Sequence, residues 1–63
     1  MRMTLKELIS VTETPIITYV RNPFTREIEQ TEITNTSDYI VKSVKANGNT
    51  IEVTVTHKTF LII

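Results

Sequence analysis

The stretch YIVKSVKANGNTIEVTVTH, residues 39–57, decides the fold of this chain. Asn47-Gly48 separates two runs in which apolar and polar residues alternate. Asn-Gly between such runs is a strong hairpin signal, because a type I′ turn needs positive φ at both central residues. The sequence therefore predicts two antiparallel strands, over 39–46 and 49–57, that form a C-terminal β-hairpin.

The predicted two-residue loop also fixes which residues of the two strands face each other. One side of the hairpin then carries most of the aliphatic residues and is the expected core face. The opposite side is polar except for Tyr39 and Val41, which form an exposed apolar patch. The pairs predicted on the core face are Val44–Ile51, Lys42–Val53, Ile40–Val55 and Asp38–His57.

The rest of the chain favours strands as well, since 12 Thr, 9 Ile and 6 Val make up 27 of its 63 residues. β-Branched side chains fit pleated strands and resist helix. A first strand is predicted over 15–20, with Pro15 at its start and a central place in the sheet. A second is predicted over 27–34, and its glutamates are typical of an edge strand protected from unwanted pairing.

A short helix is predicted at the N-terminus. Thr4 and Glu7 have the spacing of a capping box, and Leu5, Leu8 and Ile9 fall on one face of a helix over 5–11. Together these elements predict one α+β domain, residues 1–63, with the helix packed on a mainly antiparallel sheet of about four strands. The predicted core consists of Leu5, Leu8, Ile9, Ile17, Tyr19, Ile28, Ile40, Val44, Ile51, Val53 and Val55.

The size of the chain predicts self-association. A domain this small buries only about 60% of the surface of its unfolded chain and usually needs disulfides, a metal or a partner copy. The chain has no cysteine and one histidine, so a homo-oligomer is expected. The apolar end, 59–63, extends the last strand, adds a pairing in the core or lies against another subunit. The interface candidates are Tyr39, Val41, Phe60, Leu61, Ile62 and Ile63.

Charge and hydropathy exclude other classes of partner. Seven basic and seven acidic residues cancel, so the field that drives nonspecific nucleic-acid binding is missing. No apolar run approaches the length of a membrane span or of a signal peptide core. The lack of cysteine is typical of a reducing compartment, so we expect a soluble cytoplasmic protein without a membrane partner.

The residues predict no catalytic site, metal site or cofactor. His57 has Asp38 as its expected cross-strand neighbour, but a hydrolase needs a third group and a cleft. We therefore favour a polar pair at the rim of the core as the explanation of the two residues. Glu27, Glu29 and Glu32 lack the spacing of a metal-binding loop.

A small basic cluster is the candidate ligand site. Tyr19, Arg21, Asn22 and Arg26 lie in and beside the turn after the first strand, and Phe24 stands at its tip. Arginines beside aromatic rings can hold a phosphate or stack on a base. The alternative is an ordinary turn with solvated arginines.

The two ends of the chain resemble a group of known proteins. Leu5 to Val11, Pro15-Ile16-Ile17 and the hairpin from Tyr39 to Val53 resemble short accessory proteins encoded by phages and prophages of low-GC Gram-positive bacteria, whereas residues 21–38 do not. The resemblance implies a protein of the host cell cytoplasm that binds host machinery. Some such proteins inhibit a bacterial defence protein by covering it, and others form oligomers that sequester a nucleotide signal.

These observations lead to one main hypothesis and two alternatives. We expect a non-enzymatic, self-associating protein that inhibits a host defence protein by direct contact. The first alternative is an oligomeric module that sequesters a small phosphorylated ligand, such as a nucleotide second messenger. The second is a structural or virion-assembly subunit.

Overall fold

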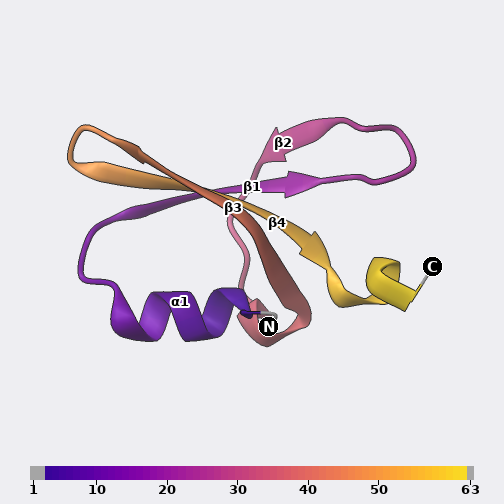
Figure 1. The fold of residues 1–63 in the computed structure, drawn as a ribbon, viewed down its shortest axis with the longest axis horizontal. Helices are drawn as coiled ribbons and strands as arrows, with labels where there is room; N and C mark the ends of the chain where they lie inside the picture. Colours follow the sequence, from indigo (N-terminus) through magenta and orange to yellow (C-terminus); the bar gives the residue numbers. More distant parts are fainter. Residues whose placement is uncertain (1–2, 63) are drawn as a thin grey trace.

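The computed structural model describes residues 3–62, and only the backbone of residues 61 and 62. The described residues form a helix on a four-stranded mixed sheet, so the predicted α+β class is confirmed (Figure 1). The strand order is β2-β1-β4-β3; β1 and β4 are parallel, and the two outer pairings are antiparallel. The elements are α1 (Leu5–Val11), β1 (Ile16–Arg21), β2 (Ile28–Gln30), β3 (Tyr39–Asn47), β4 (Thr50–His57) and the 3₁₀ helices η1 (Thr36–Asp38) and η2 (Lys58–Ile62).

Helix α1 begins at the predicted capping box. The Glu7 amide donates to Thr4 Oγ1 at 3.1 Å, and the Thr4 amide donates to Glu7 Oε1 at 3.3 Å. Both groups would otherwise lack a partner within the first turn. The cap directs Leu5 into the sheet, where only 1% of its surface is exposed. We call the side of the sheet that α1 covers the helix face.

The hairpin turn lies one residue later than predicted. Asn47 pairs with Thr50, so Gly48 and Asn49 are the central residues. Gly48 has φ of 61° and Asn49 has no positive φ, as in a type II′ turn, which requires glycine only at its first central position. The predicted register was therefore wrong: Val44 pairs with Val53 rather than with Ile51.

A β-bulge in β3 changes which side chains reach the core. Val41 pairs with Val55 and Ser43 pairs with Thr54, so Lys42 is an extra residue in the ladder. The bulge compensates for the three-residue spacing of Val41 and Val44, which both fall on the helix face. Tyr39 and Val41 were predicted on the solvated side; instead, both are partly buried and pack against the core.

The core lies between α1 and the two central strands. Leu5, Val53 and Val55 are fully buried at its centre, as predicted. Ile9, Ile28 and Val44 were also predicted there but are exposed, because they lie on the outer side of α1, on the short edge strand β2 and near the tip of the hairpin. The partly buried residues around the centre are Leu8, Ile16, Val20, Ile33, Tyr39, Val41 and Ile51. Three other predicted core residues, Ile17, Tyr19 and Ile40, are partly buried but are not among them.

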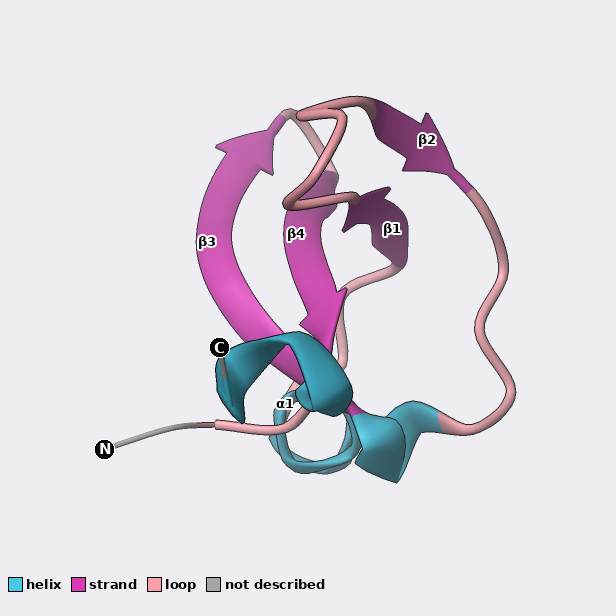
Figure 2. Ribbon diagram, turned by 90° about the vertical axis from the view of Figure 1, so that its right-hand side faces the viewer, coloured by secondary structure: helices cyan, strands magenta, loops and turns pink. Residues whose placement is uncertain are grey.

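The segment that follows β2 crosses the helix face of the sheet. The predicted strand over 27–34 is shorter, because the chain leaves the ladder after the Thr31 amide has donated to the Thr18 carbonyl at 3.1 Å. Ile33 then packs against the core, and the chain reaches η1 beside α1 (Figure 2). This crossing segment, residues 31–35, connects one edge of the sheet to the other.

The C-terminal segment turns away from the sheet. The Thr59 amide donates to His57 Nδ1 at 3.2 Å, and η2 follows β4 directly, so the tail does not extend the last strand. Phe60 lies edge-on to Phe24 with ring centroids 5.4 Å apart, which ties the tail to the loop between β1 and β2. Of the other predicted interface residues, the side chains of Leu61 and Ile62 and all of Ile63 lie outside the described residues.

Two valines that pair across the hairpin test this core. Val53→Asp places a carboxylate at a position with 0% exposure, and we expect the cooperative thermal transition to be lost. Val44→Asp is the matched control, because its 51% exposure leaves the carboxylate in water. Circular dichroism against temperature measures both variants. Equal losses of stability would contradict the burial pattern.

Candidate functional site

The four residues of the predicted ligand cluster do not form one site. Tyr19 lies on β1 and its hydroxyl donates to Glu52 Oε1 at 3.1 Å, which raises the pKa of Tyr19 above its ordinary value. Arg21 ends β1 and lines a small pocket with Phe60 and Lys42. Lys42 was not among the predicted site residues. The one unusual feature of the sequence around it is the three-residue spacing of Val41 and Val44.

Asn22 and Arg26 build the loop between β1 and β2. Asn22 Oδ1 accepts from the amides of Phe24 at 2.9 Å and Thr25 at 3.3 Å, so its side chain is used within the turn. Arg26 has φ of 64° and its amide donates to the Asn22 carbonyl at 2.7 Å. Both residues therefore have a structural role in closing the hairpin.

The expected pair of His57 and Asp38 is also absent from the described hydrogen bonds. The register places Tyr39 opposite His57, and the two rings lie edge to face. Asp38 instead forms an ion pair with Lys58, with 2.9 Å between Oδ1 and Nζ. His57 Nδ1 accepts from the Thr59 amide, and no hydrogen bond within the described part of the chain joins the imidazole to a carboxylate that could orient it as a base.

Clusters of three or more side chains of histidine, aspartate or glutamate that could hold a metal ion do not occur within residues 3–62. Over the same part of the chain, no helix has the length and apolarity needed to cross a membrane.

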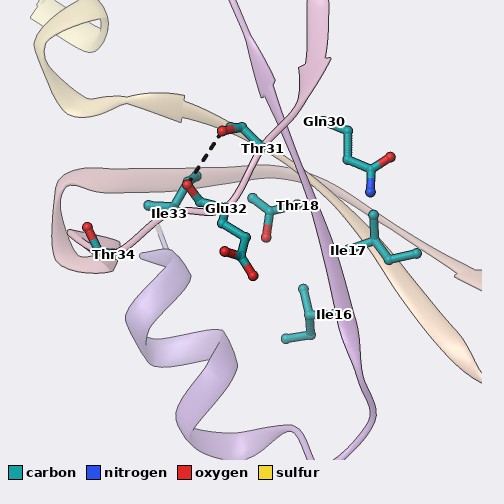
Figure 3. A pocket seen from close by; sticks show the side chains of 8 residues that line it. All are labelled: Ile16, Ile17, Thr18, Gln30, Thr31, Glu32, Ile33 and Thr34. Carbon is teal, nitrogen blue, oxygen red and sulfur yellow. Dashed lines mark hydrogen bonds between the residues drawn. The ribbon is translucent and has the colours of Figure 1, made fainter.

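A groove of about 740 Å³ lies beside the N-terminal half of β1 (Figure 3). Ile16 and Ile17 both line it, although successive side chains of a strand point to opposite faces. The groove therefore opens at the edge of the sheet rather than on one face. It is lined by Ile16, Ile17 and Thr18 of β1 and by Gln30, Thr31, Glu32, Ile33 and Thr34 at and after the end of β2.

The backbone of β1 faces this groove without a strand beside it. The Ile51 amide donates to the Pro15 carbonyl at 3.0 Å, so Pro15 faces β4. Backbone groups alternate in direction along a strand, so Ile16 faces the opposite edge, as Thr18 does. The β2 ladder pairs Tyr19 to Arg21, and one further bond reaches Thr18. The N–H and C=O groups of Ile16 are thus directed into the groove.

Three isoleucines and five polar residues line the groove, and one of the polar residues is charged. Ile16, Ile17 and Ile33 supply branched aliphatic side chains, and Glu32 is the charged residue among the lining residues. In Figure 3 the carboxylate of Glu32 extends into the space between the crossing segment and β1. The hydrogen bond drawn there involves the backbone of Glu32 and not its carboxylate. The Glu32 carbonyl accepts from Thr31 Oγ1 at 3.5 Å. An extended peptide with a cationic side chain fits these features.

The groove was not predicted from the sequence. Its position depends on where β2 ends, and the residues 31–34 alternate well enough to continue a strand. The stretch over 27–34 contains few apolar residues, and this was the available signal that β2 pairs with β1 over a short length.

Comparison with models of known protein families, with curated protein sequences and with solved structures finds no match to this chain.

The ion pair of Asp38 gives a pH-dependent prediction. The Lys58 ammonium and the Asn35 amide lower the pKa of the Asp38 carboxyl. A carboxyl with a lowered pKa stabilises the fold above its unfolded pKa of about 3.9, and this stabilisation is lost as the pH falls through the folded pKa. We expect Lys58→Met to unfold at a lower urea concentration than the natural protein at neutral pH. The two should converge in acid, below the folded pKa of Asp38.

Urea unfolding at both pH values checks this, with Lys45→Met as the control, because Lys45 has no ion pair among the described residues. A difference that persists unchanged in acid would mean that the methylene chain of Lys58 stabilises the fold through packing.

Proposed function

We propose that this protein is a non-enzymatic binding module that takes up an extended segment of a partner protein in the groove beside β1. The observation that supports this most is the unpaired edge of β1 at Ile16, directed into a groove that three isoleucines and five polar residues line. An extended segment could add to this edge as a short strand, with its backbone pairing with Ile16. Successive side chains of the segment would then contact Ile33 on one face of the sheet and Ile17 on the other.

The charge of the groove favours a partner with lysine or arginine in that segment. Glu32 is the charged lining residue, and the neighbouring Glu29 adds a second carboxylate at the edge. Opposite charges across an interface select the partner and speed its association. The resemblance to phage accessory proteins suggests that the partner is a host defence protein, which capture of this kind would inhibit.

Selection from a random peptide library displayed on phage tests the groove. Ile16→Pro removes the N–H group that faces the groove and keeps the backbone hydrogen bonds of β1 to β4, and Ile16→Val is the matched control. We expect the natural protein and Ile16→Val to enrich peptides that alternate β-branched and basic residues. One lost backbone hydrogen bond of about 1 kcal/mol should weaken those peptides about fivefold in Ile16→Pro.

Two results would contradict this proposal. The first is no enrichment on the natural protein. The second is equal binding of the enriched peptides by Ile16→Pro, once its thermal transition shows that it is folded. Glu32→Gln should reduce the preference for basic peptides without abolishing binding.

A second candidate property, self-association, is favoured by the charges of the two sheet edges. Residues 27–38, which include the edge strand β2, contain four acidic residues and no basic one. The opposite edge strand, β3, contains Lys42 and Lys45 and no acidic residue. Like edges repel each other, whereas β2 of one copy attracts β3 of another. Such a head-to-tail contact produces rings or open chains rather than a symmetric dimer.

Sedimentation velocity in low and high salt tests this association. The Debye length falls from about 30 Å at 0.01 M salt to about 3 Å at 1 M. We expect species larger than a monomer at low salt that dissociate at high salt. Glu29→Lys should remove them, because it reverses the charge in the middle of β2. A monomer under both conditions would exclude edge-to-edge association.

A further inference from the structure

A second, smaller pocket lies at the other end of β1, close to η2. Its volume is about 200 Å³, and it is lined by Arg21, Pro23, Lys42, Thr56 and Phe60. These residues come from β1, the following loop, β3, β4 and η2, so only the folded chain brings them together. None of them lines the groove beside β1.

The bulge in β3 explains why Lys42 reaches this pocket. Lys42 is the residue inserted between the pairs of Val41 and Ser43, and a bulge re-aims the side chain of its extra residue. A regular ladder in the predicted register would have placed Lys42 opposite Val53, on the core face. The structure places it beside Thr56 and Arg21 instead.

Among the described residues, the lining has two cations and no carboxylate. Arg21 and Lys42 are both exposed, and neither has an ion pair among the described residues. Two positive charges beside one small cavity repel each other, and a bound anion would relieve this repulsion. The guanidinium supplies a planar fork of donors and the ammonium a compact charge, which is the combination that binds phosphoryl oxygens.

The other walls of the pocket are held in place by contacts within the fold. Thr56 is 4% exposed, and its hydroxyl donates to the Arg21 carbonyl at 3.4 Å, which fixes the end of β1 against β4. The ring of Phe60 stands edge-on to Phe24 and to His57, with centroids 5.4 and 6.5 Å away. Phe24 itself is 68% exposed, so an aromatic surface continues outward from the pocket.

We infer that this pocket binds the phosphoryl group of a phosphomonoester that also carries an aromatic ring. Its volume is below the roughly 300–1,000 Å³ of a site that encloses a whole small molecule, so it accommodates the phosphoryl group alone. Arg21 and Lys42 hold the phosphoryl oxygens, and the aromatic part of the ligand lies outside against Phe60 and Phe24. A nucleotide and a phosphotyrosine share this chemistry.

Amide chemical shifts of the ¹⁵N-labelled full chain test the inference at constant ionic strength. The probes are inorganic phosphate, adenosine monophosphate and O-phosphotyrosine. We expect the largest shifts at Arg21, Lys42, Thr56 and Phe60, and tighter binding of one aromatic probe than of phosphate. The aromatic probe that binds more tightly identifies the source of the ligand.

Matched variants decide which residues carry the binding. Lys42→Met should weaken binding of the preferred probe about tenfold, as expected for a lost charge-assisted hydrogen bond. Lys45→Met, on the same strand but outside the pocket, should leave it unchanged. Phe24→Ala should reduce the affinity for the aromatic probe to that for phosphate.

Three results would overturn the inference. The first is the absence of shifts at these amides with all three probes. The second is equal weakening by Lys42→Met and Lys45→Met, which would mean diffuse attraction to positive charge. The third is equal affinity for phosphate and for both aromatic probes, which would remove the aromatic contact.

Discussion

The position of β4 between β1 and β3 is the constraint on which the rest of the structure depends. Val53 and Val55 of this strand are fully buried, and their only cover on the helix face comes from short elements. Burial of a branched aliphatic side chain contributes about 1.5–3 kcal/mol, so a core with three fully buried residues among those described leaves little reserve. Because the core is this small, its stability depends on the contacts that Leu5 and the crossing segment make with it. The groove and the small pocket lie at the two ends of β1, which β4 also positions.

The local elements could be predicted because their signals lie within a few residues of each other. The capping box of Thr4 and Glu7 gave the start of α1, and Asn-Gly gave the position of the hairpin to within one residue. The register could not be fixed in this way, since Asn47-Gly48 and Gly48-Asn49 are both acceptable turns. The spacing of Val41 and Val44 contained a signal for the bulge, because two valines three residues apart cannot share a face of a regular strand.

The candidate sites could not be predicted, because they depend on contacts between distant segments. The parallel pairing of β1 with β4 has no local signature, and the length of β2 is decided by the core contact of Ile33. The basic cluster illustrates the difference. Arg21 is part of a pocket, but its neighbour there is Lys42 rather than Arg26, which closes a turn. Proximity along the chain was a poor guide to proximity on the sheet.

The parallel pairing of β1 with β4 also has a kinetic consequence. The antiparallel hairpin of β3 and β4 closes through a two-residue loop and can form within microseconds, whereas β1 reaches β4 only by closing a much longer loop. Closing that loop costs more chain entropy before any of its contacts form, so β1 joins the sheet after the hairpin has formed.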